Sequence, residues 1–334
     1  MRIGVDAMGG DRGISVVVAG AVAAQSRLDS GDRIVLFGDR DAITAELAKA
    51  DDVSLIEVVH TSQVVAMDDS PVEAIRSKKD SSLVVMTVQH REGEIDACIS
   101  AGNTGACVAA AQMYMRRLKG VARPGIMVVA PTFKGIFALC DVGANVNCRP
   151  QNLLQYGIMC SEYLKYTHNV ENPRVGLISI GEEDVKGNDL VKQTNELMRA
   201  EKRIRFVGNV EGRDILRGVA DVMVCEGFVG NVILKVIEGM AESIVKGMLQ
   251  KFEEIMPDQL GRVLQVVGKL AEEFDSNNYG GAPLLGMDGI WLICHGASSS
   301  SGIMNAILKA KIFGSQDVNQ HILEHLANDV EVTV

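Results

Sequence analysis

The chain has 334 residues, of which 47% are hydrophobic and 23% are charged, which is enough for one large domain or two ordinary ones. The formal net charge of −10 argues against nucleic acid as a main partner. No run approaches the roughly 20 apolar residues of a membrane span, and we expect no signal peptide. The seven scattered cysteines form no C-x-x-C pair, so we interpret them as reduced thiols of a cytoplasmic protein.

Strand-like and helix-like runs alternate along the chain. Strands are predicted near residues 3–5, 33–38, 53–60, 95–100, 125–131, 135–143, 174–181, 204–210, 221–227 and 289–294. Helices are predicted near residues 13–28, 40–50, 70–93, 106–118, 151–167, 189–200, 231–256, 257–274 and 301–313, with a peripheral helical segment after Gly314. This alternation predicts an α/β fold, a mainly parallel sheet with helices on both faces. We treat residues 1–334 as one unit, with a hairpin about "TFKG".

Polar, glycine-rich loops follow many of the predicted strands. They are residues 6–11, 100–106, 141–145, 181–188, 226–231 and 295–302. Loops beyond the carboxyl ends of parallel strands line the ligand crevice of such folds, so we expect these loops to form one site. Any single loop also has a plain interpretation, in which serine and threonine cap helices and glycine serves turn geometry.

The loops at 102–106, 228–231 and 296–302 each precede a predicted helix, whose first N–H groups attract anions. Their side chains add neutral donors, namely Asn103, Thr104, Asn231, Ser298 and Ser299. Positive charge is available from Lys78, Lys79, Arg123 and Lys186. The combination predicts a phosphate-sized or oxyanionic ligand.

Several familiar catalytic signatures are missing. The chain has no G-x-G-x-x-G, no G-x-S-x-G and no evident His–Asp pair that would activate a serine. His321 and His325 lack the glutamate of H-E-x-x-H, so we predict no metal site. His295 follows a buried strand, and a catalytic and a structural interpretation remain equally open.

The sequence of residues 240–274 predicts two helices with strongly apolar stripes, joined at Pro257–Asp258. Such a pair is compatible with three interpretations, which are core packing, a dimer seam or a membrane-surface arm.

The chain resembles the phosphate acyltransferases of bacterial phospholipid synthesis, the PlsX family, from Ile3 to about Ile307. The resemblance rests on "VDAMGGD", "MDDSPVEAIRSKKDSSL", "SAGNTGA", "DVGANVNCRP", "VGLISIGEEDVKGN", "GNVEGRDI", "VCEGFVGNVILK", "YGGAPLLGMDG" and "CHGASS". Glu226 and Ala297 depart from the aspartate and serine that the family pattern leads us to expect.

The resemblance implies transfer of a fatty acyl group from acyl carrier protein to inorganic phosphate, without cofactor or metal. It also implies a homodimer whose fold is like that of the isocitrate and isopropylmalate dehydrogenases and the phosphate acetyltransferases. The acyl phosphate product would pass to a membrane-bound glycerol-3-phosphate acyltransferase. We therefore expect a cytoplasmic enzyme, with peripheral membrane association as a further possibility.

From their places in the strand-end loops we assign site residues as hypotheses. The catalytic candidates are Lys186, His295 and Asn231, acting on phosphate that attacks the thioester directly. The substrate-binding candidates are Asp6, Gly9, Gly10, Asn103, Thr104, Gly105, Asn145, Asn188, Gly230 and Ser298. We expect Asp6 and Asp11 to orient donors or pin loops, because like charges repel. Arg116, Arg117 and Lys119 form a candidate docking patch for the acidic carrier protein, or merely a solvated helix end.

Three other functions remain open from the sequence. A phosphate acetyltransferase-like enzyme would use coenzyme A thioesters, and a phosphate- or dinucleotide-binding regulator would show no turnover. A decarboxylating dehydrogenase would need clustered aspartates for a metal and a nicotinamide site, and neither motif is evident.

Overall fold

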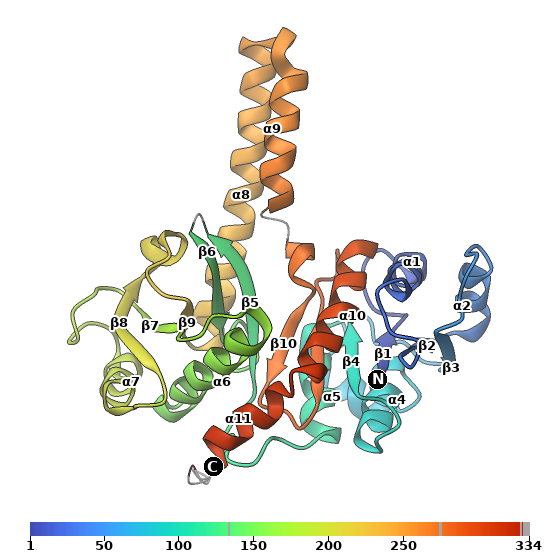
Figure 1. Cartoon of the computed structure of the whole chain (residues 1–334), viewed down its shortest axis with the longest axis horizontal. Coiled ribbons are helices and arrows are strands. Elements are labelled where there is room, and N and C mark those ends of the chain that lie inside the picture. The colour runs from blue at the N-terminus through green and yellow to red at the C-terminus, as the bar shows by residue number, and fades with distance from the viewer. Residues whose placement is uncertain (133, 274–275, 328, 330–334) are drawn as a thin grey trace.

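The computed structural model describes residues 1–132, 134–273, 276–327 and 329, and it contains one eleven-stranded sheet with helices on both faces (Figure 1). The strands are β1 (Arg2–Asp6), β2 (Arg33–Gly38), β3 (Ile56–His60), β4 (Ala97–Ser100), β5 (Gly125–Thr132), β6 (Gly135–Cys140), β7 (Arg174–Ser179), β8 (Arg205–Glu211), β9 (Val222–Val224), β10 (Ala282–Leu285) and β11 (Ile290–Ile293). The α-helices are α1 (Ile14–Gln25), α2 (Arg40–Leu47), α3 (Pro71–Ser77), α4 (Ser82–Arg91), α5 (Thr104–Tyr114), α6 (Pro150–His168), α7 (Asp189–Ala200), α8 (Gly227–Ile255), α9 (Leu260–Glu273), α10 (Ser300–Ser315) and α11 (Val318–Leu326). Short 3₁₀ turns are η1 (Gly212–Arg217), η2 (Pro257–Gln259) and η3 (Ser276–Tyr279).

The strands at the centre of the sheet are largely apolar because both of its faces are covered. In β2, Ile34 and Leu36 belong to one apolar cluster, whereas Val35 and Phe37 belong to another. Successive side chains of a strand point to opposite faces, so the two clusters are the cores on the two sides of the sheet. The predicted α/β architecture is therefore confirmed.

The strand order is β3-β2-β1-β4-β11-β10-β5-β6-β9-β7-β8. Seven of the ten neighbouring pairs in the described sheet are parallel, and the three antiparallel pairs join β11, β10, β5 and β6 in the middle. The predicted hairpin about "TFKG" is the β5–β6 pair, although Phe133 lies outside the described residues. The strand direction reverses at each of these three pairs. In the strand order given above, the strands from β3 to β11 therefore point opposite to those from β6 to β8. The loops that follow β1, β4 and β11 therefore open toward one edge of the sheet, and those that follow β6, β7 and β9 toward the other.

The segment at 70–93 is not the single helix that its sequence predicts. It begins as expected with Pro71 as the first residue of α3, but the helix stops at Ser77. Lys78 leaves the helical backbone conformation, and its Nζ turns back to the carboxylate of Asp69 at 2.5 Å. Ser81 then caps a new helix, α4, by accepting a hydrogen bond from the Val84 N–H. The side-chain bonds of Lys78 and Ser81 thus outweigh the local preference for one continuous helix.

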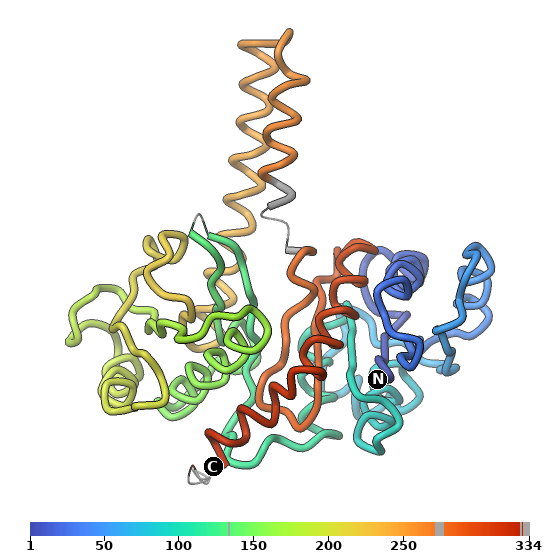
Figure 2. The backbone as a smooth tube through the Cα atoms, in the orientation of Figure 1, coloured from blue at the N-terminus to red at the C-terminus, as the bar shows by residue number. Residues whose placement is uncertain are grey.

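Helices α8 and α9 form an antiparallel arm that stands clear of the sheet (Figures 1 and 2). The exposed apolar side chains on α8 include a run that recurs every four residues, namely Phe228, Val232, Val236, Met240, Ile244 and Met248. Leu264, Val266 and Leu270 are likewise exposed on α9. Core packing is therefore the wrong interpretation for these side chains. None of the described helices combines the length and apolar composition that a membrane span requires.

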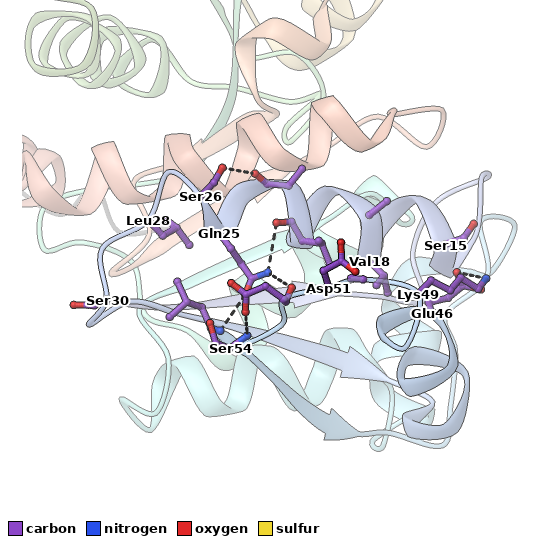
Figure 3. Close-up of a pocket in the computed structure, with 16 residues that line it drawn as sticks. Ser15, Val18, Gln25, Ser26, Leu28, Ser30, Glu46, Lys49, Asp51 and Ser54 are labelled. Carbon is purple, nitrogen blue, oxygen red and sulfur yellow. Dashed lines mark hydrogen bonds and ion pairs between the residues drawn. The ribbon is translucent and has the colours of Figure 1, made fainter.

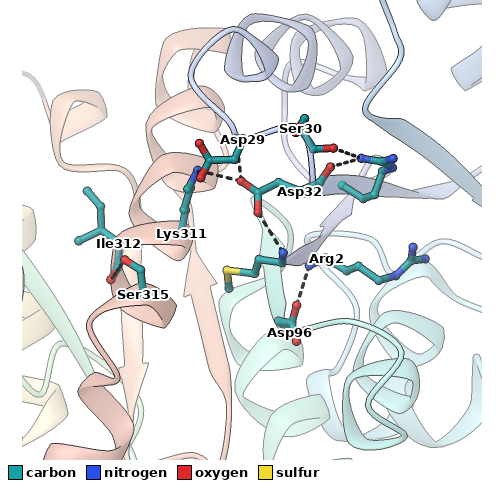
Figure 4. Close-up of polar contacts among 10 residues, drawn as sticks. Arg2, Asp29, Ser30, Asp32, Asp96, Lys311, Ile312 and Ser315 are labelled. Carbon is teal, nitrogen blue, oxygen red and sulfur yellow. Dashed lines mark hydrogen bonds and ion pairs between the residues drawn. The ribbon is translucent and has the colours of Figure 1, made fainter.

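A network of charges ties the start of the chain to α10 (Figure 4). The amino group of Met1 and the Nζ of Lys311 lie 2.9 and 2.8 Å from the carboxylate of Asp32, which is only 8% exposed. Burial acts to raise the pKa of Asp32, but hydrogen bonds from Lys311 and the amino terminus outweigh it and lower the pKa to about 2. The network fixes the first residues of β1 and β2 against α10.

Candidate active site

The loops that follow β1 and β4 are joined by Asp6. Its buried carboxylate accepts a hydrogen bond from the Ser100 hydroxyl at 2.7 Å and another from the Met8 N–H at 3.0 Å. The same Ser100 oxygen accepts from the Gly102 N–H at 2.9 Å. Burial raises the pKa of Asp6 and outweighs the opposing effect of its hydrogen bonds from Ser82 and Ser100. Asp6 therefore pins neighbouring loops, one of the two roles that the sequence suggested for it.

Gly9 and Gly10 let these two loops lie directly on each other. A Cβ on Gly9 would lie 2.6 Å from Oδ2 of Asp6 and 2.7 Å from the backbone nitrogen of Gly102. Gly10 has a φ of 103°, which side chains rarely tolerate. Close contact with the neighbouring loop thus requires Gly9, and the backbone conformation requires Gly10.

The loop that follows β11 completes this group. The Cys294 N–H donates to the carbonyl of Ser100, and the Asp11 N–H donates to the carbonyl of Gly296, each at 2.8 Å. Residues 295–298 form a turn, which we call the His295 turn, closed by a bond of 2.9 Å from the Ser298 N–H to the carbonyl of His295. Three strand-end loops therefore fix the position of His295, whose ring is exposed.

His295 faces a lysine from another element. Its Nε2 lies 3.4 Å from Nζ of Lys235 in α8, and its Nδ1 accepts a hydrogen bond from the Ala297 N–H at 3.1 Å. Because a backbone N–H can only donate, the ring proton of a neutral His295 sits on Nε2. An ammonium group also only donates, so two donors face each other. Nζ of Lys235 also pairs with the carboxylate of Glu238 at 2.8 Å, and an anion oxygen that lies beside the two nitrogens would accept from both.

The loop that follows β6 is built on Asp141. This buried carboxylate accepts four backbone N–H bonds at 2.7–3.1 Å, from Ile126, Gly143, Ala144 and Asn145. Burial raises the pKa of Asp141, and the four N–H bonds oppose this. The side-chain amide of Asn145 donates to the carbonyl of Pro124 at 2.6 Å and to the Tyr156 hydroxyl at 2.9 Å. The donors of Asn145 are thus engaged within the fold.

Helix α8 starts against the same loop. Glu226 caps the helix by accepting from the N–H groups of Phe228 and Val229, and the Gly227 N–H donates to the carbonyl of Asn145 at 2.8 Å. A Cβ on Gly230 would lie 1.9 Å from the carbonyl oxygen of Asp141, so glycine is required there. Glu226, the longer acid in this sequence, serves as a helix cap.

The first two turns of α8 connect the two groups of loops. Cγ of Asn231 lies 4.0 Å from the point that a Cβ on Gly143 would occupy, and Lys235 reaches His295. Residues four apart lie on one face of a helix, about 6 Å apart along its axis. Asn231 and Lys235 therefore place the β6 loop beside the His295 turn, although the strands before them point in opposite directions.

Comparison with known proteins decides the family. The family model for "fatty acid synthesis protein" matches residues 1–321. The chain belongs to this family. A protein from Geotalea daltonii named phosphate acyltransferase is 44% identical over 329 residues, which is 98% of this chain and 94% of that protein. A protein of the same name from Desulforamulus reducens is 44% identical over 332 residues, covering 98% of each chain.

Solved structures of low sequence identity share the fold. A phosphotransacetylase from Streptococcus pyogenes superposes with a TM-score of 0.63 at 14% identity, covering 94% of each chain. One from Staphylococcus aureus gives a TM-score of 0.60 at 16% identity, covering 93% of this chain and 94% of that one. This family member is thus an acyltransferase, on a fold that phosphotransacetylases also use.

Several of the predicted site residues form hydrogen bonds within the fold instead of facing an open space. Asn103 caps α5 through a bond from the Ala106 N–H, and its amide donates to the carbonyls of Met67 and Asp69 at 3.0 and 3.1 Å. Asn188 caps α7 in the same way.

Two further predicted residues lie at the start of α5. Thr104 is the exposed first residue of that helix, and Gly105 packs against Pro71. Ser298 lies in the His295 turn, where its N–H closes the turn.

Lys186 is not brought to His295. It is exposed in the loop after β7, which lies five strand spacings from β11, or about 24 Å across the sheet. The described contacts of this loop reach β8 and α7, through the 2.9 Å bond from Asn209 to the carbonyl of Glu183 and the ion pair of Asp184 with Arg199. Sequence reasoning missed Lys235, whose signal is its position one helical turn after Asn231.

A cavity of about 830 Å³ in the described structure lies apart from these loops (Figure 3). It runs along α1 toward α2, with Val18, Val22 and Leu55 among its apolar lining and Glu46 and Lys49 among its charged groups. None of the site loops described above contributes to it. The paired donors of Lys235 and His295 are therefore the candidate site among the described loops.

Proposed function

We propose that the chain transfers a fatty acyl group from acyl carrier protein to inorganic phosphate and releases acyl phosphate for phospholipid synthesis. The observation that carries the proposal is the pair of donors, Nε2–H of His295 and Nζ of Lys235, which face each other at 3.4 Å. A phosphate oxygen or the oxygen of a thioester carbonyl would accept from both. Family membership and the phosphate acyltransferase relatives support the same reaction.

The chemistry needs no nucleophile from the protein. An oxygen of hydrogen phosphate attacks the thioester carbonyl carbon, the carbon–sulfur bond breaks, and its electron pair leaves on sulfur. The proton of hydrogen phosphate passes to the thiolate, so atoms and charge balance. His295 stays a hydrogen-bond donor, because a proton on its Nδ1 would face the Ala297 N–H. Lys235 supplies the positive charge that holds the attacking anion, and Asn231 is a neighbouring donor on the same helix face.

The carrier protein would dock on Arg116, Arg117 and Lys119, which are exposed on the segment after α5. The Arg116 carbonyl accepts from the N–H of Asp288, just before β11, whereas His295 lies just after that strand. The four residues of β11 span about 13 Å. The flexible arm that carries the acyl group would have to bridge at least this distance.

The arm formed by α8 and α9 would be covered by a second copy of the chain. Its apolar stripe begins at Phe228 and passes Val232, beside Asn231, so the same stripe would border the acyl chain as it leaves the site. Contact with a membrane surface is the competing use of this stripe. Contact with a membrane would bring the acyl phosphate toward a membrane-bound glycerol-3-phosphate acyltransferase.

The decisive assay measures acyl phosphate formed from phosphate and either acyl carrier protein or coenzyme A thioesters. We expect phosphate-dependent product with a clear preference for the carrier-protein thioester. A preference for coenzyme A thioesters would indicate the phosphate acetyltransferase-like alternative. Absence of acyl phosphate with both donors would refute the proposed function.

A further inference from the structure

The His295 turn has one anchor that does not come from the strand-end loops. The backbone N–H of Ser299 donates to Oδ1 of Asn277 at 3.2 Å. Asn277 belongs to η3, the segment through which the chain returns from the arm to the sheet. Ser299 itself caps α10 by accepting from the Gly302 N–H, so Asn277 holds the junction between the turn and the helix.

The return segment is bound firmly to α10. The side chain of Asn305 donates to the carbonyl of Asn277 at 2.9 Å. Lys309 is 9% exposed, and its Nζ donates to the carbonyls of Tyr279 and Gly281 at 2.6 and 3.0 Å. The hydrogen bonds from Asn305 and Lys309 hold the return segment against α10.

The approach of Asn277 to α10 is also sterically tight. A Cβ on Gly302 would lie 2.3 Å from Oδ1 of Asn277. Glycine at this helical position costs helix stability relative to alanine, so the close approach to Asn277 is the feature it allows.

We propose that Asn277 is a positioning residue, which sets the orientation of His295 from the base of the arm. It acts through the His295 turn and does not touch the reacting atoms. The Ser299 N–H is two residues beyond Ala297, whose own N–H fixes the ring of His295. Without the hydrogen bond from Ser299 to Asn277, one end of the His295 turn loses its anchor. The Nε2–H of His295 is then no longer held in one orientation beside Nζ of Lys235.

The test compares three variants at this contact with a matched control. Asn277→Ala removes the acceptor, whereas Asn277→Asp keeps an oxygen that can accept from Ser299. Gly302→Ala displaces Asn277 while favouring the helix. Gly212→Ala is the control, because this exposed glycine of η1 lies outside the arm and has open space around its Cβ position.

In the acyl phosphate assay, which rests on the proposed function, Asn277→Ala and Gly302→Ala should lower kcat at least tenfold with little change in the KM of the acyl donor. Asn277→Asp should restore most of the activity, and Gly212→Ala should retain it. In a His295→Ala background, Asn277→Ala should have almost no further effect, because the residue acts through His295. An equal loss in both backgrounds, or a Gly302→Ala enzyme with full activity, would overturn the assignment.

Isotope-edited NMR of the His295 ring separates this inference from the proposed function. Asn277→Ala should shift or broaden the ring signals, and Asn277→Asp should restore them, even if the chain makes no acyl phosphate. Ring signals that are unchanged in Asn277→Ala would overturn the inference while leaving the proposed function intact.

Discussion

Replacement of Lys235 by methionine tests the donor pair most sharply. The change removes the charge and the donor but keeps an unbranched apolar side chain on α8. A charge-assisted hydrogen bond contributes about 1.5–3 kcal/mol, which corresponds to roughly 10- to 150-fold in rate. The side chain of Lys235 is 55% exposed, so we expect the lower part of that range.

The loss should fall on kcat/KM for phosphate, because Lys235 holds the anion. Lys235→Arg keeps the charge and should retain more of the activity than Lys235→Met. Lys186→Met is the matched control, since the structure places that lysine on the far side of the sheet. Steady-state kinetics with varied phosphate provides the measurement, and circular dichroism confirms folding. A folded Lys235→Met enzyme within threefold of wild type, or a larger loss in Lys186→Met, would refute the reasoning.

Four further predictions concern the rest of the molecule. Asp32→Asn should lower the free energy of unfolding by about 2 kcal/mol at neutral pH, because the pKa of Asp32 is about 2 in the folded state and 3.8 ordinarily. In denaturation measured at several pH values, the difference between variant and wild type should disappear as the pH falls from 4 to 2. A difference that does not depend on pH would contradict this prediction. Gly230→Ala should reduce thermal stability strongly, by about 3 kcal/mol or more, because its Cβ would strike the β6 loop; an unchanged melting temperature would contradict this. Reversing the charges of Arg116 and Arg117 should raise the KM for acyl carrier protein at low salt and leave that for phosphate unchanged; no change in the donor KM would reject the patch. Ile244→Glu should shift sedimentation from dimer to monomer, whereas a monomeric wild type that binds vesicles would favour the membrane alternative.

The sequence predicted ten of the eleven described strands and missed β10 (Ala282–Leu285). The physical reasons for the success are visible in the strands. Apolar runs such as that of β2 can be stable only when both faces are covered, so helices on both sides follow from composition. The hairpin at residues 125–140 and the joint at Pro257 depend on short-range geometry and were predicted as well. The break between α3 and α4 was missed because it depends on the contact of Lys78 with Asp69, which no helical periodicity reveals.

The arrangement of the site was harder to predict, because it depends on pairings between distant segments. Strands β10 and β5 are adjacent in space and about 150 residues apart in the chain, and their antiparallel pairing helps to reverse the direction of β6 and β9. The six strand-end loops were expected to form one site, whereas the loops after β6, β7 and β9 open at the edge opposite to those after β1, β4 and β11. Lys186 is removed from His295 by that reversal, whereas α8 runs back across the sheet and delivers Lys235.

Direct attack by phosphate is the central claim, and isotope transfer tests it most directly. Acyl carrier protein thioester is mixed with phosphate labelled with heavy oxygen in a single turnover, and both the product and the intact protein are weighed by mass spectrometry. The account predicts acyl phosphate that carries all the labelled oxygens, and a protein that never gains the mass of an acyl group. A transient acyl-protein adduct, or an acyl product without the label, would contradict it.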